Sequence, residues 1–536
     1  MSQMKLSFFG ADRCVTGSCH CLEVGGKTIL IDCGLQQGRD EIDNASLPFA
    51  PAGVDYVLVT HAHIDHSGRL PMLVRQGFRG RILTTAPTAE LLKIMLADSA
   101  HIQESDAAYQ NRKNERAGRP LVEPIYTVED AMRVADYIDT CGYDHTIDLC
   151  PGVKATFIDA GHLLGSASIR LTLTEGEETR TIVFSGDIGN VDQPILRDPQ
   201  CFHEADYVVM ESTYGDRNHT EVWSYTEELA QIIDETFRRG GNVVIPSFAV
   251  GRTQELLYFI REIKDRGLVT AVPDFPVYVD SPLARAATTI FCGDLRGYLD
   301  DEALALVQDG TAMFSFPGLR LTETTEESKL LNEDRTPKVI ISASGMCDAG
   351  RIRHHLKYNL WRPDSAIVFV GFQSPGTLGR TLLDGAQSVR LFGEEVAVRA
   401  KIVNFPGLSS HADRDHLLRW IGQFDPAQTQ HVFIVHGDRD VAPLFADSVK
   451  ALGFAAHAPQ YTEVYDLLLN AQTAPGYLPE RKKVTFEGKK TAPAYQRLVQ
   501  LGDSLAALIR RSKGRDNKTL AAFADAIRKI IEKFEF

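Results

Sequence analysis

Short runs of Val and Ile alternate along the chain with longer stretches of helical periodicity. Apolar residues at helical spacing predict one helix over residues 90–117 and another over residues 226–239. Eight apolar runs, each ended by polar residues, predict buried strands at residues 54–60, 180–187, 205–212, 241–247, 275–281, 337–344, 365–372 and 431–438. Strands that alternate with helices predict an α/β fold. Polar residues that directly follow such strands are expected at the sheet edge where α/β proteins bind their ligands.

The chain has 536 residues, which is too long for one hydrophobic core, so two or three domains are expected. A composition of 44% hydrophobic and 24% charged residues is typical of a globular protein. The sequence holds no apolar run that approaches the roughly 18 residues needed to span a bilayer, so no membrane partner is expected. The first residues lack the pattern of a secretory signal, and nine scattered cysteines suggest no disulfide framework. These features predict a cytoplasmic protein.

Charge is distributed unevenly, because the end of the chain is basic. The net charge of −14 excludes attraction of the whole molecule to nucleic acid, although a local basic groove remains compatible with it. Residues 481–536 contain 14 Lys or Arg against 6 Asp or Glu, so this tail carries +8 and the rest of the chain −22.

The tail is predicted to form two amphipathic helices, with Asp516 and Asn517 as turn or cap residues between them. The positions that share an apolar face are Leu498, Leu501, Leu505 and Leu508 in the first helix, and Leu520, Phe523, Ile527 and Phe534 in the second. These helices are expected to pack on their own domain or on a second subunit, which would make a homodimer. The alternative is a tail that guides nucleic acid.

A dense group of metal-binding residue types follows the apolar run at residues 54–59. His61 and His63 occupy alternate positions after a strand, so both rings can reach one side, and Asp65 and His66 stand at a turn into a helix. Imidazole and carboxylate side chains suit zinc. The spacing predicts a metal site in preference to an exposed polar turn.

One loop supplies too few ligands for two metal ions, so further ligands are expected later in the chain. His162 and Asp187 each follow an apolar run. Taken alone, either is a weak signal, because a histidine at a strand end is more often a satisfied polar residue.

Taken together and in this order, the motifs resemble those of the metallo-β-lactamase superfamily. The residues that carry the resemblance are His61, His63, Asp65, His66, His162 and Asp187. Residues 30–34 match the first motif of the superfamily, whose aspartate, here Asp32, orients a metal ligand. The resemblance implies an αββα sandwich with two metal ions at one edge of two facing sheets.

After Asp187 the chain continues far beyond the end of a small hydrolase of this superfamily. Residues 211–215 resemble motif A of the β-CASP nucleases, residues 376–379 resemble the start of motif B, and residues 408–413 resemble motif C, whose histidine is a metal ligand. The chain therefore resembles the prokaryotic β-CASP ribonucleases, which are related to the endonuclease of the pre-mRNA 3′-end cleavage machinery.

The resemblance covers about residues 5–465, and together with the basic tail described above it predicts four segments. These are a first part of the metallo-β-lactamase sandwich (1–205), an inserted α/β β-CASP domain (206–385), a second part of the sandwich (386–475) and a basic helical extension (476–536).

The family roles, carried over to this sequence, imply two zinc ions. The implied ligands are His61, His63, His162 and Asp187 for the first ion, and Asp65, His66 and His411 for the second, with Asp187 between the two ions. Hydroxide activated by the ions would hydrolyse RNA during processing or decay, leaving 5′-phosphate and 3′-hydroxyl ends. The implied catalytic residues are Asp32, Asp65, Glu211 and His411, and Glu211 is expected to organise protonation of the leaving oxygen.

One departure from the family pattern concerns motif B, which commonly carries a histidine shortly after Gly-Thr-Leu. Arg380 and Thr381 stand there in this chain. Arg380, His354 or His355 is expected to replace that histidine. The other interpretation of the two histidines is that they are partly exposed helix residues.

Six residues of the inserted domain are expected to bind RNA phosphates through side-chain donors or accessible backbone N–H groups: Arg252, Ser344, Gly345, Gly376, Thr377 and Arg380. The alternative is that these residues only form turns. A hydrolase of a small thioester or lactone is a competing function. The motifs at 211–215 and 409–413 weigh against it, as do residues 280–284, which also resemble a signature of the β-CASP family. A DNA nuclease is harder to exclude, because contacts to the 2′-hydroxyl cannot be recognised in the sequence. The pattern likewise does not distinguish endonuclease from 5′-exonuclease activity.

Overall fold

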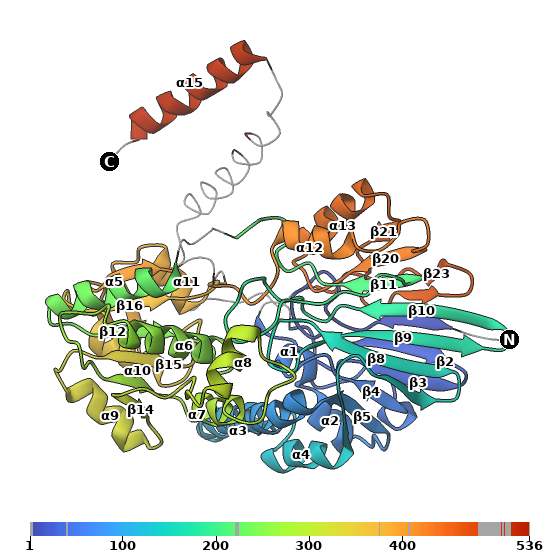
Figure 1. The fold of residues 1–536 in the computed structure, drawn as a ribbon, viewed down its shortest axis with the longest axis horizontal. Coiled ribbons are helices and arrows are strands. Elements are labelled where there is room, and N and C mark those ends of the chain that lie inside the picture. The colour runs from blue at the N-terminus through green and yellow to red at the C-terminus, as the bar shows by residue number, and fades with distance from the viewer. Residues whose placement is uncertain are drawn as a thin grey trace. The chain divides into compact units, whose positions relative to one another are not determined.

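The computed structural model describes residues 4–38, 41–219, 224–374, 376–405, 408–480, 505, 509 and 516–534. The chain divides into two compact units, residues 1–481 and residues 482–536. The described residues of the first unit form three large sheets and one two-stranded sheet, and two of the large sheets face each other (Figure 1).

The strands of these two sheets have the following bounds. The first sheet contains β1 (Lys5–Phe8), β2 (His20–Val24), β3 (Lys27–Ile31), β4 (Tyr56–Leu58), β5 (Arg81–Thr85), β6 (Ile138–Cys141), β22 (Val464–Asp466) and β23 (Ala471–Ala474). The second contains β7 (Thr146–Cys150), β8 (Val153–Asp159), β9 (Ala167–Glu175), β10 (Glu178–Phe184), β11 (Tyr207–Met210), β20 (His431–Ile434) and β21 (Ala456–His457). Their orders are β23-β22-β1-β2-β3-β4-β5-β6 and β21-β20-β11-β10-β9-β8-β7.

Alternate residues of these strands fill the space between the two sheets. Phe8 and Ile31 of the first sheet are buried in one cluster with Phe157, Phe184 and Phe433 of the second. Helices cover the outer faces, namely α2 (Leu70–Arg75), α3 (Ala86–Ala117) and α4 (Val128–Arg133) on the first sheet, and α12 (Arg414–Ile421) and α13 (Val441–Ala451) on the second (Figure 1). The arrangement is the αββα sandwich that the resemblance implies.

The third sheet is parallel throughout, and it is covered on both faces. Its order is β14 (Leu319–Leu321), β13 (Val277–Val279), β15 (Val339–Ser342), β12 (Val243–Pro246), β16 (Ala366–Phe369) and β19 (Lys401–Asn404). Val243 and Ile245 pack with α5 (Tyr225–Arg238) and α6 (Arg252–Asp265). Val244 packs on the other face with α10 (Ile352–Asn359), α11 (Leu378–Leu383) and the hairpin β17 (Ser388–Leu391) and β18 (Glu394–Ala397). Burial on both faces explains the continuous apolar runs of these strands.

The remaining elements of the first unit are short, apart from α7. They are η2 (Pro51–Gly53), α1 (Ile64–Ser67), η3 (Val134–Tyr137), α7 (Pro282–Phe291), α8 (Asp301–Gln308) and α9 (Thr325–Glu333). All eight predicted strands are present, and the two predicted helices correspond to α3 and α5. No helix of the described residues combines the length and the apolar character that crossing a membrane requires.

The strand pairing places the insertion differently from the sequence-based boundaries at 206 and 386. Strand β11 lies within the range predicted for the insertion, yet it pairs with β10 and β20 in the sandwich. Strand β19 lies within the range predicted for the second part of the sandwich, yet it pairs with β16 in the third sheet. The inserted elements therefore run from α5 to β19, because the chain leaves the sandwich after β11 and returns to it after β19.

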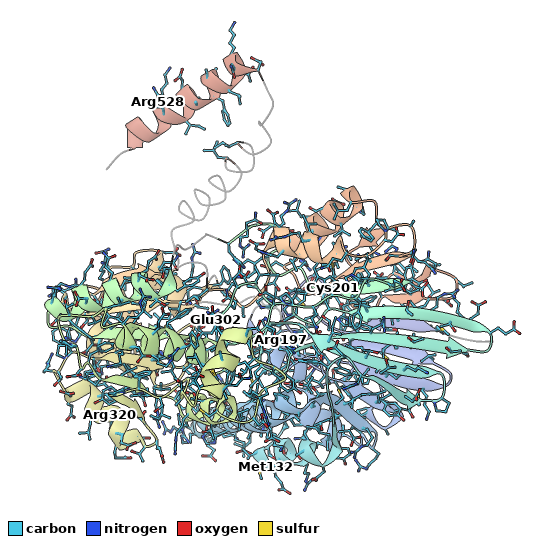
Figure 2. The ribbon with its side chains drawn as sticks, viewed as in Figure 1. Met132, Arg197, Cys201, Glu302, Arg320 and Arg528 are labelled. Carbon is cyan, nitrogen blue, oxygen red and sulfur yellow. The ribbon has the colours of Figure 1, made fainter. Side chains whose placement is uncertain are left out.

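The sandwich and the inserted domain are joined beside Arg197, which is labelled in Figure 2. The Arg197 guanidinium donates to the backbone oxygen of Gly297 at 2.6 Å and lies 3.0 Å from the carboxylate of Asp159. The backbone N–H of Asp300 donates to the oxygen of Ile195 at 3.0 Å. These contacts connect the strand end before His162 with the inserted domain.

In the second unit, one helix is described, α15 (Asn517–Phe534). Its first turn is capped by Asp516, which accepts hydrogen bonds from the backbone N–H and the hydroxyl of Thr519. The second predicted tail helix is thus confirmed. The first, with Leu498, Leu501 and Leu508, lies outside the described residues.

Candidate metal centre and active site

Polar residues that follow five strands meet at one edge of the sandwich. Strands β10, β11 and β20 are parallel neighbours, so Asp187, Glu211 and His436 emerge at the same edge of the second sheet. His61 follows β4 of the facing sheet, and His162 follows β8. The convergence results from strand pairing, since the residues are far apart along the chain.

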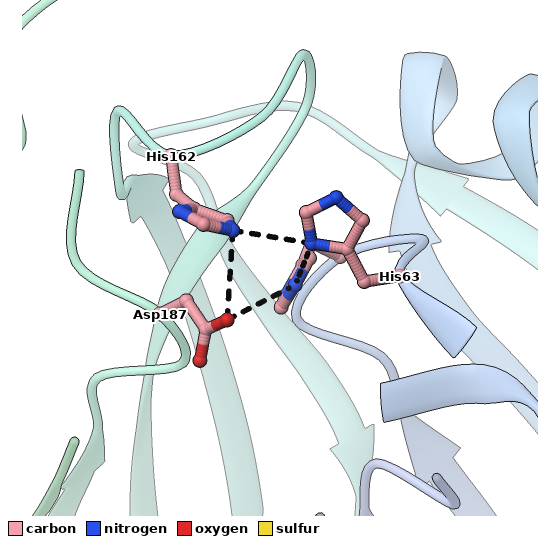
Figure 3. A group of neighbouring side chains, drawn as sticks. His63, His162 and Asp187 are labelled. Atoms are coloured by element: carbon pink, nitrogen blue, oxygen red, sulfur yellow. Dashed lines mark hydrogen bonds and ion pairs between the residues drawn. The ribbon is translucent and has the colours of Figure 1, made fainter. Parts of the chain in front are cut away.

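The first group comprises His61, His63, His162 and Asp187, whose ligand atoms point at one position (Figure 3). His63 Nδ1 lies 3.0 Å from His61 Nε2 and 3.1 Å from His162 Nε2. Asp187 Oδ2 lies 3.4 Å from His61 Nε2 and 3.5 Å from His162 Nε2. Four ligand atoms at such separations are the donor set of a metal ion.

The charge states of this group also suit a metal. Burial and the neighbouring histidines lower the pKa of His61 and of His162 well below the ordinary value, so both rings are neutral and each offers a lone pair. Burial alone would raise the pKa of Asp187, but the charges of His436 and His66 hold it well below its usual range. The aspartate is therefore ionised.

The second group comprises Asp65, His66 and His436. His436 Nε2 lies 3.5 Å from Asp65 Oδ2, and His66 Nε2 lies 3.2 Å from Asp187 Oδ1. His66 Nε2, His436 Nε2 and Asp187 Oδ1 are buried, and none of them has a hydrogen-bond partner among the described residues. Because buried polar atoms are costly without partners, these three atoms fit a second metal ion. Asp187 thus turns one oxygen toward each group.

Asp32 contacts the ring nitrogen of His66 that faces away from the metal position. Its Oδ2 lies 2.7 Å from His66 Nδ1, and its Oδ1 accepts a hydrogen bond from the backbone N–H of Thr60 at 2.8 Å. Asp32 has a left-handed backbone with φ of 63°, and Gly34 nearby leaves room for the metal loop, since a β-carbon there would overlap the oxygen of Asp65. The carboxylate fixes the ring orientation and leaves Nε2 free for a ligand.

A third group joins Glu211 and His411 to Asp187. His411 Nδ1 lies 3.1 Å from Glu211 Oε1, and His411 Nε2 lies 3.9 Å from Asp187 Oδ2. Glu211 is buried and accepts hydrogen bonds from the backbone N–H groups of Ile188, at 2.6 Å, and Thr213, at 3.2 Å. Burial would lower the pKa of His411, but the charges of Glu211 and Asp187 outweigh it and raise the pKa to about 9.

The structure differs from the sequence prediction at one ligand position. His411 was expected beside Asp65 and His66, but His436 takes that place, and His411 pairs with Glu211. The physical reason is the pairing of β20 with β11, which brings the residue after β20 to the metal edge. The signal was present in the sequence, because His436 follows an apolar run just as His162 does.

In the structure Glu211 pairs with His411, and the residues expected to replace a motif B histidine lie elsewhere. Arg380 Nε donates to Asp384 at 2.9 Å on an exposed helix surface. His355 Nε2 lies 2.5 Å from the buried carboxylate of Asp280, and the ring of His354 stacks on Phe392.

The residues predicted to bind RNA phosphates fall into two sets. Arg252 is buried and forms an ion pair with Glu255, so its guanidinium is not free for a phosphate. Ser344 and Gly345 follow β15, whereas Gly376 and Thr377 lie after β16, so all four stand at the carboxyl edge of the third sheet. Thr377 caps α11 by accepting a hydrogen bond from the backbone N–H of Arg380.

An αββα sandwich with His and Asp ligands at one edge defines a metal-dependent hydrolase of the metallo-β-lactamase class. Family models agree with this class along the chain. The model of the metallo-β-lactamase superfamily matches residues 12–234, that of the Beta-Casp domain matches residues 253–382, and that of the Zn-dependent metallo-hydrolase RNA specificity domain matches residues 395–459.

Curated relatives match over most of the chain. Ribonuclease TTHA0252 of Thermus thermophilus is 39% identical over 438 residues, which are 82% of this chain and 94% of that protein. Transcription termination factor FttA of Methanocaldococcus jannaschii is 30% identical over 84% of this chain and 69% of its own length. The FttA of Methanothermobacter thermautotrophicus is 31% identical over 81% and 67%. The chain belongs to the β-CASP ribonuclease family.

Proposed function

We propose that the protein hydrolyses phosphodiester bonds in RNA with two zinc ions. The observation that carries this proposal is the pair formed by the buried Glu211 and the partly exposed His411 beside Asp187. A leaving 3′ oxygen needs a proton, and a histidine held by a carboxylate supplies it. A thioester hydrolase releases a thiolate, which is a much weaker base than an alkoxide and has less need of such an acid. The names of the relatives, a ribonuclease and transcription termination factors, support RNA as the substrate.

The residues of the two metal groups fit zinc, since all their ligand atoms are imidazole nitrogens or carboxylate oxygens. The proposed ligands are His61, His63, His162 and Asp187 for the first ion, and Asp65, His66, His436 and Asp187 for the second. When bound, two zinc ions supply a water-derived nucleophile at neutral pH and neutralise the charge that develops on the phosphate.

The chain's own residues have separate tasks in this reaction. Asp32 keeps His66 in the tautomer that presents Nε2 to the metal position. Glu211 orients His411 and favours its protonated form, and His411 gives its proton to the leaving 3′ oxygen. The expected products are a 5′-phosphate and a 3′-hydroxyl, because water attacks in place of the ribose 2′-hydroxyl. Homodimer formation and a cytoplasmic location stay predictions.

The test compares the wild type with His63→Ala and His411→Ala on end-labelled RNA and on DNA of the same sequence. We expect RNA cleavage by the wild type alone, a lower zinc content in His63→Ala, and full zinc content in the inactive His411→Ala. Cleavage of DNA at a rate equal to that of RNA would make the protein a general nuclease. Equal RNA cleavage by all three proteins would overturn the proposed function.

A further inference from the structure

Two exposed phenylalanines stand at the carboxyl edge of the third sheet. Phe248 follows β12 and Phe372 follows β16, which pair side by side, and their exposed fractions are 51% and 47%. Both residues lie in the loops beyond the strand ends, and phenylalanine is among the residue types that are most often buried. Two exposed rings on neighbouring strand ends therefore indicate a surface that a ligand covers.

The loop that carries Phe248 is held by two contacts. The Thr253 hydroxyl donates to the backbone oxygen of Phe248 at 2.6 Å. Gly251, three residues later, packs against Leu163, so that an added β-carbon would lie 3.1 Å from the Leu163 side chain. Leu163 is the neighbour of His162 in sequence. The loop that carries Phe248 is thus packed against the loop that carries a proposed metal ligand.

Phe372 approaches the same region from the side of His411. The Arg217 guanidinium lies 5.5 Å from the centroid of the Phe372 ring and 4.7 Å from that of Tyr214. The ring of Tyr214 is 6.3 Å from that of His411. A chain of ring and cation contacts therefore connects Phe372 to the proposed proton donor.

The two phenylalanines share one support, which is the backbone of Gly345. The Phe248 ring lies so close to it that an added β-carbon would be 3.4 Å from two ring atoms. The side-chain amide of Gln373, the residue after Phe372, donates to the oxygen of Gly345 at 3.1 Å. The Phe248 loop packs on Leu163, the neighbour of His162, and Phe372 is connected through Arg217 and Tyr214 to His411. The rings of His162 and His411 are 4.4 Å apart.

The candidate active site is partly exposed at His411. The His411 side chain is 20% exposed, whereas His162 is fully buried. Arg217 is exposed, lies over the rings of Tyr214 and Phe372, and forms an ion pair with Asp216 at 2.8 Å. Unlike the buried pair of Arg252, such an exposed pair is weak, so a phosphate can compete for the guanidinium. A ligand that covers both rings and enters the site must therefore combine flat apolar faces with negative charge.

We propose that Phe248 and Phe372 stack on unpaired bases of single-stranded RNA that flank the scissile phosphate. This inference rests on the proposed function and adds to it how the substrate strand is held. Every base has a flat face, so stacking tolerates any sequence but requires bases that are not buried in a duplex. Arg217 lies where it can contact a phosphate next to a stacked base.

The test uses Phe248→Ala and Phe372→Ala with two end-labelled substrates. One is a single-stranded RNA oligonucleotide, and the other has the same sequence with abasic nucleotides on both sides of the cut. Stacking is worth about 1–3 kcal/mol per base in alanine substitutions, so each variant is expected to raise KM on intact RNA by roughly 5- to 150-fold. The value of kcat should stay near that of the wild type, because the proposed ligands and His411 are unchanged.

On the abasic substrate, which lacks both bases, the wild type is expected to lose about the product of the two single-variant factors, and the variants should lose nothing further. Phe392→Ala serves as the matched control, because Phe392 is also 47% exposed but stacks on His354 in the β17–β18 turn. Phe248→Leu and Phe372→Leu keep the apolar packing and remove the flat ring, so they should behave like the alanine variants if stacking is the cause.

An unchanged KM on intact RNA in both alanine variants, or equal losses on intact and abasic RNA, would overturn the stacking proposal. Wild-type KM values in both leucine variants would do the same, since apolar contact would then suffice. These outcomes leave wild-type RNA cleavage intact. Absence of wild-type cleavage would instead overturn the proposed function, so the two failures are distinguishable.

Discussion

Replacing Asp32 by Asn keeps the shape of the side chain and removes one of its two acceptor oxygens. If the remaining oxygen keeps the hydrogen bond from the Thr60 N–H, the new amide group faces His66 Nδ1, which lies 2.7 Å from the carboxylate in the wild type. Nδ1 must then accept a hydrogen bond, so the ring proton moves to Nε2. That atom lies 3.2 Å from Asp187 in the second metal group, and a protonated nitrogen cannot bind a metal.

The expected loss concerns one metal ion of the proposed two. Loss of a residue that orients a metal-binding histidine typically weakens metal affinity by about 10- to 100-fold, which corresponds to about 1.4–2.8 kcal/mol. The first group has its imidazole ligands on His61, His63 and His162, so the affinity of the first ion should stay near the wild-type value.

Zinc titration in competition with a chromogenic chelator measures both affinities. The matched control is Asp55→Asn, because Asp55 also accepts a backbone N–H, that of Thr28 at 3.0 Å, and pairs with Lys27 far from the metal edge. Thermal unfolding of the metal-free proteins checks that the fold is kept. Two ions bound by Asp32→Asn with wild-type affinity would refute the argument from the His66 tautomer.

Three further predictions follow from the structure. Glu211→Gln removes a charge that raises the pKa of His411 to about 9. We therefore expect kcat to fall by roughly 10²-fold or more, and the decline of activity at alkaline pH to begin at a lower pH than in the wild type. A pH–rate profile with an unshifted alkaline limb would contradict this. Burial lowers the pKa of His20 to about 3. Below pH about 6.5 the unfolded state therefore takes up a proton on this ring and the folded state does not. The free energy of unfolding then falls by about 1.4 kcal/mol per pH unit as the pH decreases toward 3. His20→Phe should lose less stability than the wild type between pH 6.5 and 5.5 in urea unfolding with chelator present, and equal losses would argue against the assignment. Removal of residues 482–536 leaves the unit that contains every site residue, so kcat on a short RNA should be unchanged. If the removal also reduces the salt dependence of RNA binding, the tail contacts phosphates.

Eight of the strands, and helices α3 and α5, could be predicted from the sequence because their signals are local. A parallel strand buried on both faces, such as β12 or β16, appears as an uninterrupted apolar run wherever it is placed. The dense cluster from His61 to His66 also carries its own signal, since its ligands lie on one loop.

The remaining details depend on long-range pairing, which the local pattern does not contain. An apolar run does not specify which sheet a strand joins, and so β11 and β19 were placed on the wrong side of the domain boundaries. Likewise, the choice between His411 and His436 as a neighbour of Asp65 depends on the position of β20 beside β11. The exposure of Phe248 and Phe372 results from packing around their loops, and their sequence context resembles that of buried residues.

The pairing of β20 with β11 across the whole insertion has a consequence during protein synthesis. A nascent chain that has emerged only as far as β11 already contains His61, His63, His162 and Asp187, but it lacks both His411 and His436. The ribosome must translate more than two hundred further codons before either residue can reach Glu211 or Asp65. Under the proposed mechanism, the polypeptide is therefore expected to stay inactive toward nearby transcripts, its own messenger included, until most of the chain has been translated.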